Sequence, residues 1–520
     1  MGKYVGIDLG TTYSVAAFIN EDGLPQIIPN DNGKNTTPST VLFEENAIIV
    51  GETAKEEGFS NPENYEAFVK RHMGERDYWF TTAEGTKYSP EEISAIILKK
   101  LKSDAEAYLG EEISGAVITV PAYFNDAQRK ATMDAAAMAK MNVLSIINEP
   151  TAAALAFGIS KGKQEQQTVL IYDLGGGTFD VCIMRFTDKE IISLAGEGNR
   201  ALGGYDFDNK IIDYVKEKAA EQGIDITKDV YAMQDLQIKA EQAKCALSAK
   251  DKIKTSIVIN VQGKPLKIVI TREEFNEMIE NLLTRTISVM ENAMEEAGLE
   301  YSEIDKILLV GGSTRIPYVR EMIEEETGIK PSSEVHPDEA VAIGAAYHAL
   351  EMAKNRACEE PAEMKEAILN SLPDSKNQYQ FQDVTAHGIG IISINEYNEK
   401  VNTVILPKNS KIPSEGYEEF VTLEDYQAHL LIEVTQGEEE DIRYVTVIGT
   451  SELKIKPKPG QVRIRVSIGC DSDSIIHVRV TDLQDNEDLG EMKIDRIANL
   501  TEEEVKENTE KLESLNISGE

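Results

Sequence analysis

The chain has 520 residues, too many for one ordinary hydrophobic core, so its length predicts two or three domains. A net charge of −38 disfavours binding to nucleic acid or to an anionic membrane surface. Apolar residues make up 41% of the chain and charged residues 28%, which is ordinary for a globular protein.

Cysteine usage and hydropathy favour the cytoplasm. The sequence has no CxxC pair and no histidine near a cysteine that would suggest a zinc site. The scattered thiols therefore fit a reducing compartment. They are Cys182, Cys245, Cys358 and Cys470. The chain opens into a strand pattern at residues 4–7 without a signal-peptide core. No apolar run reaches the roughly 18 residues needed to cross a bilayer.

From Met1 to about Leu350, short apolar strands alternate with amphipathic helices, which is typical of a layered α/β fold. One helix is predicted to start at Ser89, because a capping serine is followed by Pro90 and two acidic residues. A second is predicted to follow Asn125 and to run to about Met141.

An internal near-repeat is the most informative feature of this region. Residues 4–18 read Y-V-G-I-D-L-G-T-T-Y-S-V-A-A-F, and residues 169–184 read V-L-I-Y-D-L-G-G-G-T-F-D-V-C-I-M. Each segment predicts a strand, a tight glycine-rich turn and a second strand. Two lobes built on one plan, each offering a turn to a shared cleft, are the simplest account.

Glycine-rich turns of this kind suit phosphate, because backbone N–H groups approach it without a side-chain clash. Asp8 and Asp173 stand at the strand ends, where they could hold a magnesium ion through its waters. Either turn alone is equally compatible with a plain β-hairpin; the two matched copies favour a split phosphate site. Neither a Walker A loop nor a dinucleotide GxGxxG between strand and helix is found.

A third segment, residues 307–315, reads as a buried strand that runs into glycines and then a helix. This geometry suits an anion or a nucleoside at a helix start. A βα turn without a ligand is the alternative, and it would be the better interpretation if the segment stood alone.

Beyond Ala349 the character of the sequence changes. Residues 351–383 are polar, contain Pro361 and Pro373, and predict a weakly helical connector. From Val384 to about Asp495, apolar and polar residues alternate with period 2, which predicts half-buried antiparallel strands in a small sandwich. Residues 501–512 predict a short charged helix.

Six motifs in the same order resemble the seventy-kilodalton heat-shock chaperones (DnaK-like). They read I-D-L-G-T-T from residue 7, V-P-A-Y-F-N-D-A-Q-R from 120, I-I-N-E-P-T-A-A-A from 146, D-L-G-G-G-T-F-D from 173, V-G-G-S-T-R-I-P from 310 and P-D-E-A-V-A-I-G-A-A from 337. The resemblance is close over residues 2–350 and looser from Asp383 through L-T-E-E-E-V at Leu500.

The resemblance implies a two-lobed, actin-like (ribonuclease H-like) ATPase domain at 1–352, a connector at 353–383, a β-sandwich peptide-binding domain at 384–498 and a short helical tail at 499–520. It implies an ATP-dependent chaperone in which slow ATP hydrolysis controls binding and release of unfolded polypeptide segments. Its cofactors would be ATP or ADP and Mg²⁺, with K⁺ as a further candidate. A J-domain co-chaperone and a nucleotide exchange factor would be its partners.

The resemblance also implies roles for individual residues. Phosphoryl transfer depends mostly on positioning and electrostatics, so these residues need only hold the reacting groups and offset the charge that develops. The residues implied for the phosphates are Gly10, Thr11, Thr12, Tyr13, Gly175, Gly176, Gly177 and Thr178. Those implied for catalysis are Lys70, Glu149, Asp173 and Thr178, and those for the metal are Asp8, Glu149 and Asp173. Those implied for adenosine are Glu241, Lys244, Ser248, Gly311, Gly312, Ser313, Arg315 and Asp338.

Outside the nucleotide site, the resemblance implies a relay between nucleotide state and linker. Its members are Pro121, Arg129, Glu149 and Asp383. Leu430 and Ile432 match positions that line the family's pocket for an apolar peptide side chain. Ordinary sandwich core remains an alternative for both, because period 2 fits either.

The chain departs from the family pattern at several places. Ser145 stands where the family usually has an arginine used in docking J-domain proteins, so we expect an altered choice of co-chaperone. The linker reads Y-Q-F-Q-D at residues 379–383 instead of a leucine-rich run, after a longer connector. Asn402 falls where an apolar arch residue is expected over the peptide. The long helical lid after the β domain is almost absent, so we expect fast peptide exchange.

Three rival functions are considered. A small-molecule kinase of the same superfamily needs an aspartate base beside a substrate pocket and has no need of the β domain. An actin-like filament former is disfavoured by the acidic surface and the added sandwich. A nucleotide-gated adaptor with little hydrolysis is disfavoured because the hydrolytic residues are all present.

Overall fold

Two sheets of the same design build the N-terminal region of this computed structural model, which describes residues 3–161, 166–359, 361–374, 379–472, 474–492, 499–513 and 515–519. Their strand orders are β11-β10-β1-β2-β3 and β17-β12-β13-β14-β18. In each sheet an antiparallel hairpin, β1–β2 or β12–β13, pairs in parallel with a later strand, β10 or β17. The hairpin repeat predicted from the sequence is therefore confirmed.

The strands of the first sheet are β1 (Lys3–Asp8), β2 (Tyr13–Ile19), β3 (Pro25–Ile28), β10 (Ile113–Val120) and β11 (Val143–Asn148). Those of the second are β12 (Gln167–Leu174), β13 (Phe179–Phe186), β14 (Glu190–Asn199), β17 (Lys306–Val310) and β18 (Gln380–Gln382). Both predicted helices form where their caps place them: α2 (Pro90–Leu109) begins with a Ser89 capping box and α3 (Asp126–Met138) with an Asn125 capping box.

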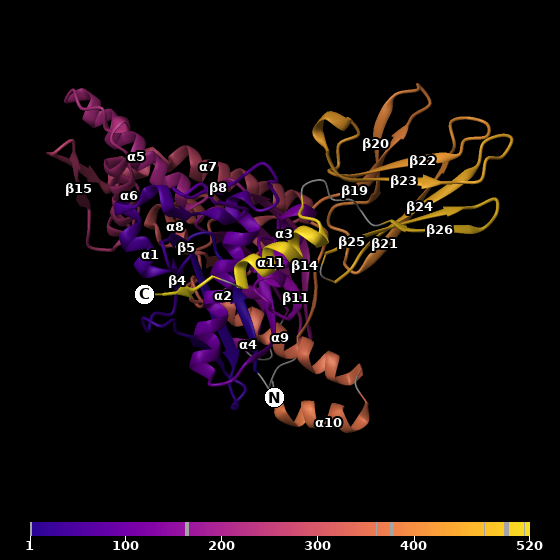
Figure 1. The fold of residues 1–520 in the computed structure, drawn as a ribbon, viewed down its shortest axis with the longest axis horizontal. Coiled ribbons are helices and arrows are strands. Elements are labelled where there is room, and N and C mark those ends of the chain that lie inside the picture. The colour runs from indigo at the N-terminus through magenta and orange to yellow at the C-terminus, as the bar shows by residue number, and fades with distance from the viewer. Residues whose placement is uncertain are drawn as a thin grey trace.

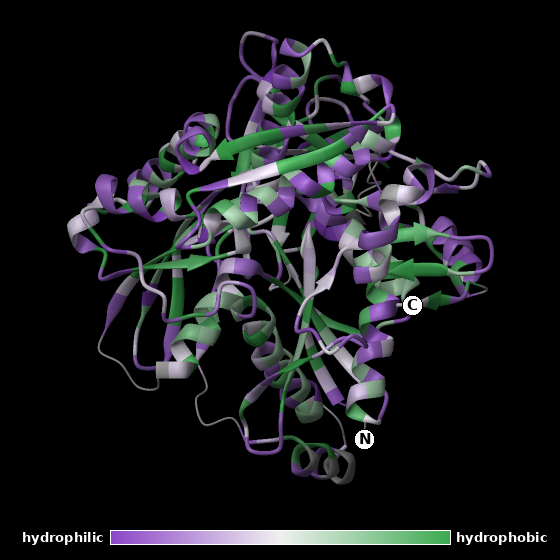
Figure 2. Ribbon diagram, turned by 90° about the vertical axis from the view of Figure 1, so that its left-hand side faces the viewer, coloured by the Kyte–Doolittle hydropathy of each residue, from purple (hydrophilic) through white to green (hydrophobic). Residues whose placement is uncertain are grey.

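Helices α4 (Glu149–Lys161) and α9 (Ala340–Glu359) pack against each other, and α9 also lies on β1. Small residues allow this close packing. A Cβ on Gly344 would lie 1.7 Å from the Ala152 carbonyl oxygen, and one on Gly6 would lie 2.1 Å from the Ala346 nitrogen. The backbones therefore approach closely enough to join the two sheets into one body. In Figure 2 the strands of the interior are largely hydrophobic.

Each sheet has its own core. The first packs α2 and α3 over residues such as Ile7 and Ile118, and the second packs further helices over residues such as Tyr172 and Leu309. Those helices are α5 (Gly204–Glu221), α6 (Val230–Ser248), α7 (Arg272–Ala297) and α8 (Pro317–Thr327). A hairpin of β15 (Lys254–Val261) and β16 (Lys264–Thr271) extends from this second lobe.

Eight strands form the described part of a β-sandwich that projects from one side of the molecule (Figure 1). One sheet has the order β20 (Lys400–Leu406), β19 (Ile389–Ile394), β22 (His429–Gln436) and β23 (Thr446–Lys454). The other has β21 (Ser414–Val421), β24 (Arg463–Cys470), β25 (Ile476–Asp482) and β26 (Glu487–Met492). Alternate residues of β24 and β25 enter the core, as the period-2 pattern predicts. The predicted end of this domain, 498, lies outside the described residues.

The connector is more helical than the sequence predicts. Helix α9 continues to Glu359, beyond the predicted domain end at residue 352, and α10 (Ala362–Ser371) follows it. The chain then adds β18 to the edge of the second sheet, parallel to β14. On the sandwich side, Lys408 forms ion pairs with Glu197 and, at 2.7 Å, with Glu296. The sandwich is thus docked on the second lobe.

The C-terminal segment folds back onto the first lobe. Helix α11 (Glu502–Glu513) lies against α3 and α2 (Figure 1). Strand β27 (Ile517–Ser518) pairs in parallel with β6 (Ile48–Val50). The same sheet also contains β5 (Thr40–Phe43) and β7 (Tyr65–Ala67). Leu512 is completely buried in the first lobe's core. Arg76 donates to the Asn499 carbonyl at 2.6 Å and pairs with Glu504 at 3.0 Å.

No helix among the described residues is both long and apolar enough to span a membrane.

The predicted C-terminal helix is confirmed, whereas the short strand β27 has no signal in the sequence pattern.

Substituting Leu512→Asp should release the C-terminal segment from the first lobe, because a carboxylate in that apolar core is costly without a partner. We expect faster trypsin cleavage at Lys506 and Lys511 and a lower thermal midpoint. Intact-mass spectrometry measures the cleavage. Leu24→Asp is the matched control, since Leu24 is 54% exposed. Equal protection of the tail in both variants would contradict the assigned packing.

Candidate active site

The turns of the two repeated hairpins face each other across the lobes. A Cβ on Gly176 would lie 1.9 Å from the Thr12 hydroxyl oxygen, and one on Gly177 would lie 2.6 Å from the Thr11 methyl carbon. Only glycine permits so close an approach. The two sequence segments that predict a split phosphate site are therefore adjacent in space.

A cleft of about 480 Å³ opens beside these turns. Nearly all the residues predicted for nucleotide and metal line it. They are Asp8, Gly10, Thr11, Thr12, Tyr13, Lys70, Glu149, Asp173, Gly175, Gly176, Thr178, Glu241, Lys244, Ser248, Gly311, Gly312, Ser313, Arg315 and Asp338. Gly177 instead packs between the lobes, against Thr11 and Gly203. Lys34, Glu52 and Cys245 also line the cleft and had no signal in the motifs.

Lys70 and Glu149 form a buried ion pair at the floor of the cleft, with Nζ 2.6 Å from Oε1. Lys70 is only 6% exposed and lies in a short 3-10 turn, η3 (Val69–His72). Glu149 begins α4 directly after β11. Burial of a lysine is costly unless a carboxylate pairs with it, so the pair holds the Lys70 ammonium at a fixed position.

Buried carboxylates crowd the same place. Burial, with the Glu149 charge second, raises the pKa of Asp8 to about 7 and raises the pKa of Asp173 well above its ordinary value. The Thr119 hydroxyl donates to Asp8 at 3.1 Å, whereas the buried Oδ2 of Asp173 has no hydrogen-bond partner among the described residues. An unsatisfied anionic oxygen beside further acids fits a cation and its waters. Among the described residues, no group of three or more His, Cys, Asp or Glu side chains is arranged to hold the ion directly.

Asp180 belongs to this cluster and was not predicted. It stands opposite Asp173 in the β12–β13 register, and it accepts a hydrogen bond from the Tyr123 backbone N–H at 3.0 Å. Burial, with the Glu149 charge second, raises its pKa to about 7. The motif D-L-G-G-G-T-F-D contains this second aspartate, and its place across a hairpin from Asp173 was the available signal.

The residues predicted for adenosine line the same cleft. Lys244 pairs with Asp208 at 2.7 Å and donates to the Gly204 carbonyl at 3.0 Å. Arg315 pairs with Asp338, and Gly311, which has a φ of 81°, turns the chain from β17 into this site.

An unpredicted residue, Lys55, bridges the lobes beside the cleft. It pairs with Glu241 of α6 at 2.6 Å and donates to the Tyr13 hydroxyl at 2.9 Å.

The predicted relay residues meet at Asn148, which the sequence analysis missed. Its side-chain amide donates to Asp383 at 2.8 Å and accepts from Arg129 at 2.6 Å. Arg129 also donates to the backbone of the segment that follows Pro121, and Thr151 donates to Asp383 at 2.8 Å. Because Asn148 directly precedes Glu149, Asp383 bonds to the residue next to the Lys70–Glu149 ion pair.

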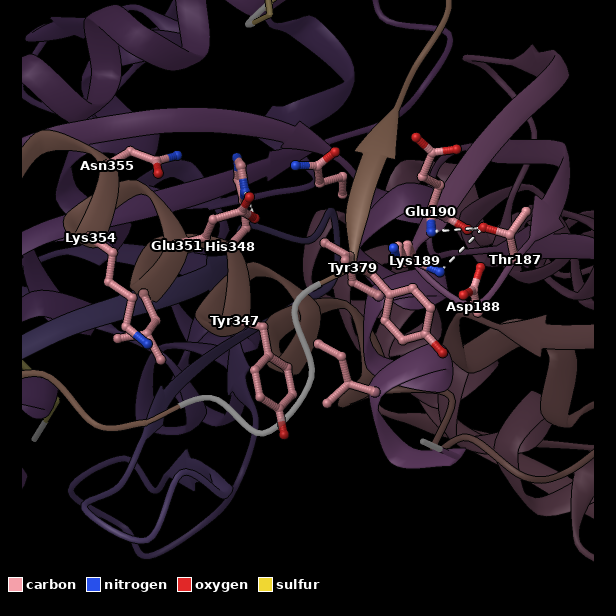
Figure 3. A pocket seen from close by; sticks show the side chains of 14 residues that line it. Thr187, Asp188, Lys189, Glu190, Tyr347, His348, Glu351, Lys354, Asn355 and Tyr379 are labelled. Atoms are coloured by element: carbon pink, nitrogen blue, oxygen red, sulfur yellow. Dashed lines mark hydrogen bonds and ion pairs between the residues drawn. The ribbon is translucent and has the colours of Figure 1, made fainter. Parts of the chain in front are cut away.

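The linker strand borders a second cavity of about 510 Å³ between α9 and β14 (Figure 3). Tyr347, Glu351 and Tyr379 are among its lining residues. The buried His348 ring packs edge-on against Phe381 of β18, 4.9 Å between centroids, and its Nε2 lies 3.3 Å from the Ser145 hydroxyl.

Ser145 is only 6% exposed, and the expected change in the choice of co-chaperone stays a prediction. A basic side chain is close by: Arg356 of α9 donates to the Leu144 carbonyl at 3.1 Å.

In the sandwich, Leu430 and Ile432 are 8% and 6% exposed and belong to the core. Asn402 is buried too: its amide donates to the Gly437 and Glu439 carbonyls at 3.2 and 3.0 Å. The expectation that Asn402 forms an arch over a bound peptide is therefore wrong, because its side chain is committed to the loop that follows β22.

Comparisons with known proteins agree with this geometry. A family model described as Hsp70 protein matches residues 4–518. A chaperone protein DnaK from Thermotoga neapolitana is 44% identical over 511 residues, which cover 96% of this chain and 82% of the relative. The DnaK proteins of Thermotoga petrophila and Thermotoga maritima are 43% identical with the same coverage.

The segment that carries Lys70 contains a buried acid whose titration should affect stability. Burial raises the pKa of Glu66 from 4.5 to about 7, although the Tyr78 hydroxyl donates to it at 3.1 Å. The folded chain therefore binds a proton that the unfolded chain releases, so this residue's stabilising contribution is present below pH 4.5 and is lost as pH rises through 7.

Glu66→Gln should consequently raise the thermal midpoint at pH 8, and the gain should shrink as the pH approaches 4.5. Differential scanning calorimetry across this range measures it, with the exposed neighbour Glu63→Gln as control. A gain that does not vary with pH would show that Glu66 is not protonated by burial.

Proposed function

Because the chain belongs to the Hsp70 family of ATP-dependent chaperones, we propose that ATP hydrolysis in the cleft between its two lobes controls binding and release of extended polypeptides by its β-sandwich. The protein is an ATPase that binds ATP or ADP with a divalent metal and assists protein folding. The contact between Gly176 and Thr12, beside the Lys70–Glu149 pair, is the observation that carries the assignment of the cleft.

The lobes are proposed to have the actin-like arrangement, since each repeats one hairpin design and presents its turn to the shared cleft. The proposed division is an ATPase domain at 1–352, a connector at 353–383, a peptide-binding sandwich at 384–498 and a helical tail at 499–520.

Within the cleft, backbone N–H groups and hydroxyls of the two turns hold the β- and γ-phosphates. Lys70 places the attacking water and offsets the charge that develops on the transferred phosphoryl group. Thr178 supplies a hydroxyl beside that phosphoryl group. Asp8, Glu149 and Asp173 hold the metal through its waters, and Mg²⁺ is the proposed ion, with K⁺ as a further candidate. When bound, the ion neutralises phosphate charge. Asp180 completes the acidic cluster and fixes the Tyr123 backbone.

The nucleotide's effect reaches the linker through Asn148, and the proposed partners follow from this arrangement. Unfolded segments bind the sandwich, at a site formed with Leu430 and Ile432. A J-domain co-chaperone contacts the surface around the linker strand, and an exchange factor acts on the ATPase lobes. The proposed location is the cytoplasm.

Lys70→Ala should lower ATP turnover by about 100-fold or more, because the ammonium acts mainly on charge that develops in the transition state. ADP affinity should change far less, and calorimetric titration with magnesium present measures it alongside single-turnover hydrolysis. Lys3→Ala is the control, since Lys3 pairs only with surface Glu111 at 3.6 Å in the described chain. Turnover equal to that of the parent would remove Lys70 from catalysis.

Peptide release should be fast even with ADP, because the described residues that follow the sandwich lie on the first lobe and leave the sandwich uncovered. A cover mainly slows dissociation, so a sandwich that these described residues do not cover should release peptide in about seconds. Stopped-flow fluorescence of a labelled peptide measures the rate. Release that takes many minutes would mean that another element closes the site.

Leu430→Asp should abolish peptide binding, since it places an unpaired charge at the proposed pocket. Its neighbour Leu431 is 62% exposed on the other face of β22, so Leu431→Asp is the matched control. Circular dichroism of both variants separates loss of the pocket from loss of the fold.

A further inference from the structure

The turn that carries Lys70 adopts a conformation that its sequence does not favour. Phe68, which caps η3, has a φ of 63°, in the left-handed region that a bulky side chain rarely adopts. Such a conformation is strained and persists only where surrounding contacts enforce it. Those contacts therefore determine where the Lys70 ammonium lies.

Tyr205, at the start of α5 in the second lobe, makes the contacts that cross to this turn. Its ring lies 4.7 Å from the Phe68 ring, and the Arg71 guanidinium lies over it at 4.7 Å from the centroid. Both Phe68 and Arg71 belong to the Lys70 turn, one on each side of the lysine. An aromatic pair and a cation–π contact are each directional, so together they fix the orientation of the turn.

The neighbouring Asp206 strengthens the same crossing. Its carboxylate accepts two hydrogen bonds from Arg71, at 2.9 and 3.3 Å, and a third from the Gly203 backbone N–H at 2.9 Å. The Arg71 and Asp206 side chains are only 16% and 20% exposed. A paired, partly shielded guanidinium and carboxylate form a rigid link rather than a solvent-exposed contact.

The backbone of Tyr205 is fixed to the phosphate loop. Its N–H donates to the Gly176 carbonyl at 2.7 Å, and the Gly204 N–H donates to the Gly175 carbonyl at 3.0 Å. The α5 start therefore touches both parts of the hydrolytic site: the loop at 175–178 by its backbone, and the Lys70 turn by its side chains.

We propose that Tyr205 is a positioning residue for ATP hydrolysis, whose ring holds the Lys70 turn of the first lobe in register with the phosphate loop of the second. The inference rests on the proposed catalytic role of Lys70. A displacement of about 1 Å at a reacting group can lower a rate by 100-fold while ground-state binding persists.

Single-turnover ATP hydrolysis and calorimetric titration with ADP and magnesium test this role in the full chain. Tyr205→Ala should lower the hydrolysis rate by about 10- to 100-fold, with ADP affinity and thermal midpoint close to those of the parent. Tyr205→Phe keeps the ring and should restore the rate. Tyr214→Ala is the control, because this tyrosine lies on the same helix but bonds to Glu274 within the second lobe.

Two further variants separate ring contact from backbone conformation. Phe68→Gly relieves the left-handed backbone but removes the ring, so it should slow hydrolysis. A rate above that of the parent would show that the backbone conformation, and not the ring, limits turnover. Arg71→Lys keeps the charge but loses the paired hydrogen bonds and should slow hydrolysis by a smaller factor than Tyr205→Ala.

Unchanged hydrolysis in Tyr205→Ala would overturn the proposal. An ADP affinity that falls by as large a factor as the hydrolysis rate, together with a lower thermal midpoint, would also overturn it. Failure of the parent chain to bind ADP or to hydrolyse ATP would instead contradict the proposed function itself.

Discussion

The buried carboxylate of Asp383 is the constraint on which the relation between cleft and sandwich depends. A buried charge of this kind must be satisfied, and Asn148, Thr151 and the Val384 backbone donate to it. Asn148 also accepts a hydrogen bond from Arg129 and directly precedes Glu149. One residue therefore bonds to Asp383 while the next pairs with Lys70. Because the two contacts lie on consecutive residues, we propose that the end of β11 couples the nucleotide site to the linker.

The remaining architecture maintains this geometry. The matched hairpins bring two turns to one cleft, and close packing of α4 on α9 makes one body of the two sheets. Burial, with the Glu149 charge second, raises the pKa of Asp8 and Asp180 to about 7, and Lys70 is the buried counter-charge beside them. The acids around Lys70 outnumber this one lysine, so a metal ion would add positive charge beside them on binding with the nucleotide.

Local signals in the sequence were sufficient for the repeat, the capped helices and the two glycine-rich turns, whereas most other cleft residues were predicted only from the family resemblance. Ser89 and Asn125 cap their helices by bonding to residues close in sequence. Glycine-rich turns can be predicted because the backbone conformation they require is local. Asn148 and Lys55 escaped prediction because each has a partner more than a hundred residues away, Asp383 for Asn148 and Glu241 for Lys55. The burial of Ser145 depends likewise on α9, whose packing no local pattern encodes. The same holds for β27, a two-residue strand defined by its partner alone.

The central claim is that Asn148 transmits nucleotide state to the sandwich, and the ratio of peptide release rates in ATP and in ADP tests it most directly. Asn148→Leu preserves shape but cannot bond to Asp383 or Arg129. Stopped-flow release from the parent and the variant should show that ATP accelerates release in the parent and hardly at all in the variant, while the variant still binds ATP. Full ATP acceleration in Asn148→Leu would contradict the account and place the coupling elsewhere.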